Sequence, residues 1–178
     1  MFWDREKLLS VTVKPKPKYH DRIIDKKDNY TIVDDKNGEK ITLEEHKRKY
    51  PYKIDKDFIC YVKTTHRKFS FTIPVDYCWN GADIPRVLWF FVGSKDNPEF
   101  KVPSCVHDFL LEFRGYIYKN ILREEITVSQ YRRLTSLIFR ELLKQYGTKT
   151  VKSNIMASAV AGFQFLSPQW RDMDNEKT

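Results

Sequence analysis

The sequence lacks the features that mark disulfide-stapled or membrane-spanning proteins. Its three cysteines form an odd set with no Cys-x-x-Cys pair, so disulfides are not its framework and we expect a reducing compartment. The longest apolar run, residues 87–92, is far shorter than the ~20 residues of a bilayer-spanning helix, and the first residues lack the pattern of a cleaved signal peptide. We therefore expect neither an integral membrane protein nor a classically secreted one.

The composition fits one globular domain over residues 1–178. Hydrophobic side chains make up 41% of the chain and charged ones 31%, which is enough to form a buried core with a solvated surface. Thirty-two Lys and Arg residues against 24 Asp and Glu residues give a net charge of +8, which is moderate for an obligate nucleic-acid-binding protein. Aromatic residues reach 15% and supply contact area to cores and protein interfaces alike.

Residues 1–20 are predicted to form an extended arm or a sheet edge. Within residues 11–18 two prolines remove backbone donors and bias the residues before them to extended geometry. Further along, strands at 30–33 and 40–43 flank Asn37-Gly38, a pair that favours the positive φ of a tight hairpin. We therefore expect a first hairpin there.

A second hairpin is predicted where aromatic and β-branched residues dominate. Residues 57–63 and 68–75 are such runs, and a short polar turn separates them. In the later run, Phe69, Phe71 and Ile73 share one face at a period of two, so that face is expected to floor the core.

From residue 84 onward the pattern becomes helical. A short apolar helix or turn is expected over 84–92, and a helix over 104–114 tolerates Pro103 at its first turn. A last helix is expected over 149–165, with small residues that allow close approach. The apolar stripe of that last helix consists of Val151, Ile155, Ala159 and Phe163.

The strongest helical pattern covers residues 130–146. Ser129 can cap its start and Gly147 marks its end. Its apolar stripe consists of Tyr131, Leu134, Ile138 and Leu142. Strands followed by helices predict an α+β fold, in which amino-terminal antiparallel hairpins pack against a carboxy-terminal helical bundle.

The residues that could carry chemistry lie in a loop over 74–85 and in His107-Asp108. A loop that leads into a helix opening with these two residues can activate a water, with His107 as the base and Asp108 as a metal ligand. The structural interpretation makes His107 a packing or capping residue and Asp108 an acceptor for backbone donors at the helix start. Gly81 stands alone, so it fits a backbone requirement better than a phosphate-binding loop.

A zinc site can also be considered, but the spacing does not favour it. The three candidate ligands, Cys78, Cys105 and His107, do not follow a standard zinc pattern. We therefore expect the cysteines to be buried apolar residues.

These segments resemble a phage-associated domain family of unknown function. Its members carry a loop like Asp-Gly-Ala-Ser-Ile-Pro-Arg, a helix opening with His-Asp-x-Leu-Tyr, a helix with Ala-Asp-x-x-Phe, and a final helix of small residues. The resemblance covers about residues 69–166, inside a core that we place at 57–166. The matching residues are Gly81, Ala82, Ile84, Pro85, Arg86, His107, Asp108, Leu110 and Phe139.

The chain departs from the family pattern at four positions. They are Asn80 for the loop Asp, Asp83 for the Ser, Leu111 for the Tyr, and Ser136 for the Asp of the third element. A carboxylate that could orient His107 is thereby missing, and an imidazole without that partner loses control of its tautomer and orientation. Glu112 and Glu141 are the carboxylates that could replace it.

The resemblance implies a virion-associated structural or assembly protein of a tailed bacteriophage. We expect it in the tail or head–tail region, synthesised in the host cytoplasm, in contact with other virion proteins and without a cofactor. The alternative is a calcium-dependent phospholipase-like or cell-wall hydrolase, similar at its site to secretory phospholipase A. In it His107 is the general base, and Asp108, Asn80 and Asp83 bind calcium. A third interpretation uses the net charge for contact with packaged DNA.

Overall fold

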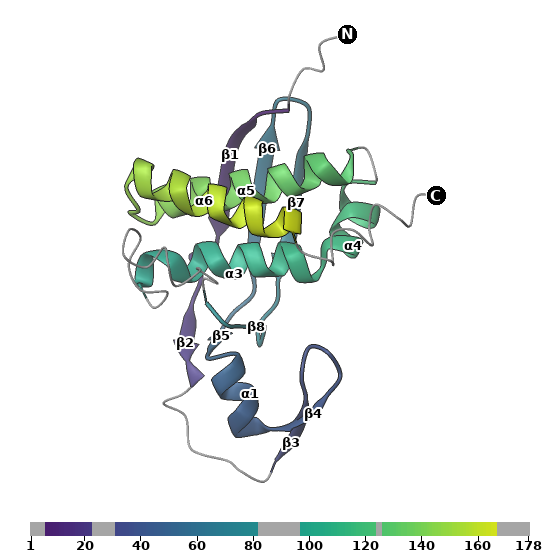
Figure 1. Cartoon of the computed structure of the whole chain (residues 1–178), viewed down its shortest axis with the longest axis vertical. Helices are drawn as coiled ribbons and strands as arrows, with labels where there is room; N and C mark the ends of the chain where they lie inside the picture. Colours follow the sequence, from purple (N-terminus) through teal and green to yellow (C-terminus); the bar gives the residue numbers. More distant parts are fainter. Residues whose placement is uncertain (1–5, 23–30, 82–96, 124–125, 167–178) are drawn as a thin grey trace.

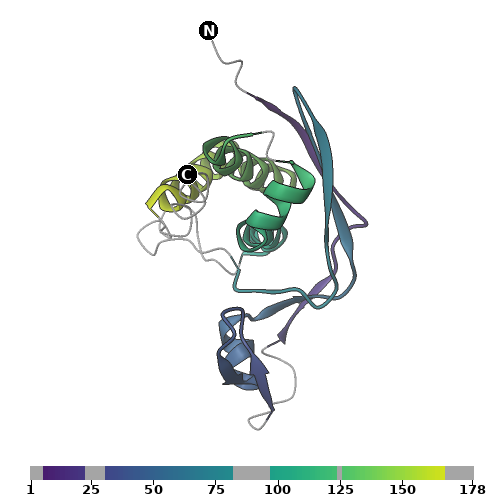
Figure 2. The same ribbon diagram turned by 90° about the vertical axis from the view of Figure 1, so that its right-hand side faces the viewer.

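The fold is a layer of antiparallel strands covered on one face by helices (Figures 1 and 2). The computed structural model describes residues 6–22, 31–81, 97–123 and 126–166, with the backbone alone at 163–166. Strands dominate up to residue 79 and helices follow from residue 98. The predicted α+β arrangement, with hairpins packed against carboxy-terminal helices, is therefore confirmed.

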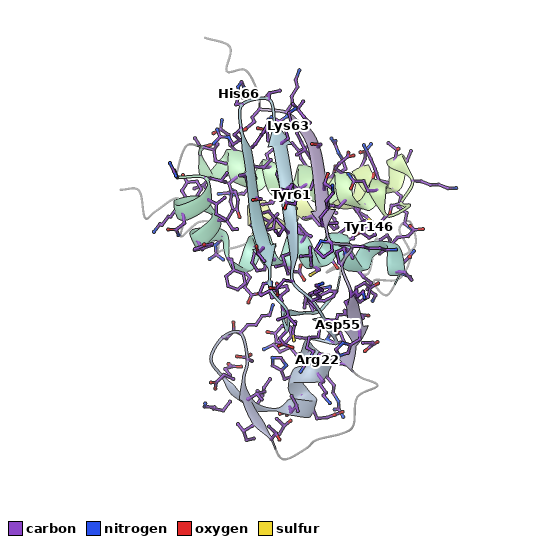
Figure 3. The ribbon with its side chains drawn as sticks, turned by 180° about the vertical axis from the view of Figure 1, so that it is seen from behind. Arg22, Asp55, Tyr61, Lys63, His66 and Tyr146 are labelled. Carbon is purple, nitrogen blue, oxygen red and sulfur yellow. The ribbon has the colours of Figure 1, made fainter. Side chains whose placement is uncertain are left out.

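Three antiparallel strands form the main sheet, in the order β1 (Leu8–Lys14), β6 (Phe58–Thr64) and β7 (Lys68–Ile73). The predicted second hairpin is β6 and β7. Strand β1, which lies in the segment predicted as an arm or an edge, pairs with β6 along its length. The alternation of the strands buries Val11, Val62 and Phe71 beneath the helices. Tyr61 and Lys63 lie on the face that the helices leave open (Figure 3).

A smaller part of the chain lies beyond one end of the main sheet (Figure 2). It consists of a second sheet of β2 (Tyr19–Asp21), β5 (Tyr52–Ile54) and β8 (Cys78–Trp79), the hairpin β3 (Ile32–Asp34) and β4 (Lys40–Thr42), and helix α1 (Leu43–Lys49). The predicted first hairpin is confirmed, with Gly38 at φ +79° in its turn. The Asp35 carboxylate organises this turn by accepting backbone hydrogen bonds from Asn37 (2.8 Å) and Glu39 (2.9 Å).

Helix α3 (Pro98–Glu112) begins six residues earlier than the helix predicted over 104–114. The elements of the helical layer are α3, the short α4 (Arg114–Tyr116), a π turn η3 (Ile117–Ile121), α5 (Val128–Gln145) and α6 (Thr150–Leu166). Asn97 caps α3 by accepting a hydrogen bond from the Glu99 backbone N–H (3.1 Å), and Pro98 follows at the first helical position. Pro103, which was predicted at the first turn, therefore lies inside the helix.

Helix α5 has the predicted buried stripe but a different cap. Thr127, rather than Ser129, forms a capping box with Gln130, because its hydroxyl accepts the Gln130 N–H while the Gln130 side chain accepts the Thr127 N–H. The four stripe residues are each at most 5% exposed. Gly147 ends the helix at φ +102°, as predicted.

Two apolar clusters hold the layers together. The larger fills the space between the main sheet and helices α3 and α5, and Trp79 is fully buried in it. The smaller joins three helices and consists of Phe100, Phe139, Leu143, Met156 and Ala157. Every residue from 100 to 107 is buried, so α3 is the central helix of the domain.

The buried face of α6 is not the predicted apolar stripe. Val151 is 72% exposed and Ile155 is 37% exposed, whereas Ser153 and Met156 are buried. The side chain of Phe163, the last residue of the predicted stripe, lies outside the described residues. Apolar and small residues lie on all sides of α6, so its sequence did not show which face would be buried. In the structure the flexible Met156 side chain fills the space next to Phe100 and Phe139.

Candidate functional site

The candidate pair His107-Asp108 lies in the middle of α3, not at its start. Since α3 begins at Pro98, His107 is in the third turn. Two predictions for this pair are therefore wrong in position. The pair does not open a helix, and Asp108 is too far along α3 to accept its free amino-terminal N–H groups. The burial of α3 on most sides places the pair within the helical layer.

His107 packs in the seam between α3 and α5. The residue is 7% exposed, and its imidazole lies against the Phe139 ring with 5.0 Å between centroids and 46° between planes. His107 Nδ1 and Asp108 Oδ1 are 3.7 Å apart, which is longer than a hydrogen bond. This is the geometry of an interior side chain with a neighbouring carboxylate at electrostatic range.

A polar cluster that the sequence did not reveal lies on the same helix one turn further along. The Tyr77 hydroxyl donates to Glu112 Oε2 (2.9 Å), and Lys36 Nζ binds the same carboxylate oxygen and the Tyr77 hydroxyl (3.3 Å). Burial raises the pKa of Tyr77, and the charges of Asp108 and Glu112 raise it further. These residues come from the β3–β4 turn, the segment before β8, and α3, so local pattern could not join them.

The two carboxylates that could have oriented His107 are engaged elsewhere. Glu112 binds Tyr77 and Lys36, and Glu141 lies 4.0 Å from Lys144 on α5. The cluster around Glu112 attaches the β3–β4 hairpin to α3.

Arg22 forms a second polar cluster, next to α1 (Figure 3). Its Nη1 lies 2.9 Å from His46 Nδ1 and donates to the Tyr50 carbonyl (3.2 Å) and to Cys78 Sγ (3.3 Å). Burial lowers the pKa of His46, and the neighbouring Arg22 charge lowers it further, which suits a neutral imidazole that accepts the guanidinium hydrogen bond. Arg22 thereby links Cys78 of the small sheet to α1.

The loop with the first motif is described only as far as Gly81. Trp79 anchors the start of this loop, because its indole Nε1 donates to Ser104 Oγ on α3 (3.2 Å). Asn80 is half-buried, and Gly81 is buried at φ +87°, the left-handed region that favours glycine. The other loop candidates and the helix expected at 84–92 lie outside the described residues. These candidates are Ala82, Asp83, Ile84, Pro85 and Arg86.

The described residues contain no group of three His, Cys, Asp or Glu side chains arranged to hold a metal ion. Cys105 is fully buried, and burial, with a smaller contribution from Asp108, raises the pKa of its thiol well above the usual value. A thiol held in its protonated form is a poor zinc ligand. The predicted calcium ligands were Asp108, Asn80 and Asp83. Of those that the structure describes, Asp108 has a carboxylate, and its side chain is 21% exposed.

The family profile described as Protein of unknown function (DUF1353) matches residues 52–160. The chain belongs to this family. The match begins at β5 and ends within α6, so it includes β6, β7, the candidate pair and the helical layer. The matched segment thus includes the part of the fold that surrounds His107, while β1 to β4 and α1 lie before it.

No curated protein and no solved structure matches the chain. Among the described helices, none is both long and apolar enough to cross a membrane.

Proposed function

We propose that this DUF1353 protein is a non-enzymatic, virion-associated structural or assembly protein of a tailed bacteriophage, located in the tail or head–tail region. It acts through contacts with other virion proteins. The observation that carries the non-enzymatic part is the burial of His107 between α3 and α5. The resemblance of its loop and His-Asp segment to phage-associated domains supports the virion setting.

The burial of His107 argues for packing because a general base must come within about 2.6–3.2 Å of the proton that it removes. An imidazole that is 7% exposed and packs at a tilt against the Phe139 ring leaves little room for a substrate. The two carboxylates that the sequence offered as replacements for the missing orienting residue, Glu112 and Glu141, lie in contacts with Tyr77 and Lys144.

Mass spectrometry of purified phage particles tests the virion assignment. Particles banded in a density gradient should contain the chain at a constant ratio to a known tail protein. The unassembled proteins of the same lysate serve as the reference for contamination. If the chain is abundant in the lysate and missing from the particles, it is not a virion component.

An activity assay separates this proposal from the hydrolase alternative. The purified chain is incubated with phospholipid vesicles or with peptidoglycan, each in the presence of calcium, and we expect no turnover. His66, in the exposed β6–β7 turn, provides a matched control position (Figure 3). Turnover that His107→Ala abolishes in a folded protein, while His66→Ala retains it, would replace the assembly proposal with hydrolysis.

A further inference from the structure

A cationic groove runs between α5 and α6. Its volume is about 410 Å³, and the described residues that line it include no carboxylate. Three arginines of α5 line one wall, and small residues of α6 line the other. The lining residues include Arg132, Arg133, Arg140, Asn154, Ala157 and Ser158.

The positive charge of the groove is not neutralised by its own helices. Helix α5 has one acidic residue, Glu141, which faces Lys144, and α6 has none. Arg133 is exposed and forms no ion pair with the residues that the structure describes. The Nε of Arg140 is buried without an acceptor among those residues. Arg140, which also lines the groove, forms no ion pair with the described residues either.

An exposed apolar strip borders the groove on α6. Val151 is 72% exposed and Ile155 is 37% exposed. Ile155 and Ser158 lie four and seven residues after Val151, so the three residues share one side of the helix. Ser158 also lines the groove, so the strip and the groove are adjacent. Helix α6 lies on the side of the helical layer away from the main sheet (Figure 2).

We infer that this groove and strip bind an acidic amphipathic segment of a partner protein. Its carboxylates pair with the guanidinium groups of Arg133 and Arg140, which can bind them in bidentate geometry. Its apolar side chains cover Val151 and Ile155, as in other complexes where an amphipathic helix lies in a groove. A polynucleotide would use the arginines and leave the apolar strip uncovered. The inference rests on the proposed function, because it names the partner chemistry through which the chain assembles.

Binding is tested by fluorescence anisotropy with a labelled helical peptide that has Glu on one face and Leu on the other. A scrambled peptide of the same composition and a short double-stranded DNA are the comparison probes. We expect tighter binding of the amphipathic peptide, weakened by added salt. Removal of one guanidinium, in Arg133→Gln or Arg140→Gln, should weaken binding about fivefold, the effect of losing one partly exposed ion pair.

The matched controls use the same changes elsewhere on the surface. Lys63→Gln removes one positive charge from the open face of the sheet and should leave peptide binding unchanged.

The apolar strip is tested separately. Val151→Ser should weaken peptide binding without changing its salt dependence. Circular dichroism and the unfolding midpoint confirm that each variant is folded.

Two results would overturn the inference. One is equal binding of the amphipathic and scrambled peptides. The other is DNA binding that exceeds peptide binding and is lost in Arg133→Gln, which would assign the groove to nucleic acid. Either result leaves the particle assay unaffected, so a chain found in particles with no peptide binding refutes the groove and not the virion assignment.

Discussion

Replacement of His107 by alanine should lower the free energy of unfolding by about 2–4 kcal/mol. Removal of a buried Phe side chain costs about 3–5 kcal/mol, and the imidazole ring is smaller. The ring is 7% exposed and packs on Phe139, which belongs to the cluster that joins α3, α5 and α6. The alanine variant would leave a cavity there and lose the ring contact with Phe139 of α5. His107→Phe retains a ring there and should cost about 1 kcal/mol, the loss of polar contacts alone.

A double-mutant cycle measures the contact itself. His107→Ala and Phe139→Leu are compared with the double variant by urea unfolding and linear extrapolation. The two ring centroids are 5.0 Å apart, so we expect a coupling energy of about 0.5–1.5 kcal/mol, the range of aromatic pairs. Val151→Ala on the exposed side of α6 is the control and should change stability by less than about 0.5 kcal/mol.

The sign of the His107→Ala effect decides between packing and catalysis. Catalytic side chains are often held in place at a cost in stability, so their removal is neutral or stabilising. A variant as stable as the wild type, with a coupling energy near zero, would therefore refute the packing role.

Three further predictions concern other parts of the fold. The hydrogen bond from Lys49 lowers the pKa of Asp35 to about 2, so ionised Asp35 stabilises the folded state fully above the unfolded pKa of 3.8. This stabilisation is lost as the pH falls towards 2. Asp35→Asn should therefore make the free energy of unfolding depend less on pH in that range. Thr127→Ala removes the α5 cap and should lower the free energy of unfolding by about 1 kcal/mol, whereas Thr127→Ser should not. In a thiol-labelling assay, Cys78 should react first, because the other two thiols are buried; equal rates would contradict the described burial.

Local patterns predicted the elements whose signals are confined to a few neighbouring residues. The period-two run through Phe71 gave the β6–β7 hairpin, Asn37-Gly38 gave the first turn, and the stripe through Leu134 gave α5. The start of α3 was also available in the sequence, because Asn97 before Pro98 is a typical cap followed by a first-turn proline. Pro103 was instead predicted to lie at the first turn of the helix.

Contacts between distant segments could not be predicted. The pairing of β1 with β6 joins residues about fifty positions apart, and the Lys36–Tyr77–Glu112 cluster draws on three separate segments. The buried face of α6 depends on the shape of the space between α3 and α5. The sequence of a helix with small or apolar residues on all sides does not show which face will be buried.

The central claim is that His107 acts by packing and that the protein acts by contact. It is tested most directly by the amount of the His107→Phe variant that enters phage particles when it replaces the wild-type chain. Quantitative mass spectrometry should find the same ratio to a tail protein for both chains, with equal infectivity. A folded His107→Phe chain that enters particles normally but leaves them non-infective would show that the imidazole itself is needed, and would contradict the claim.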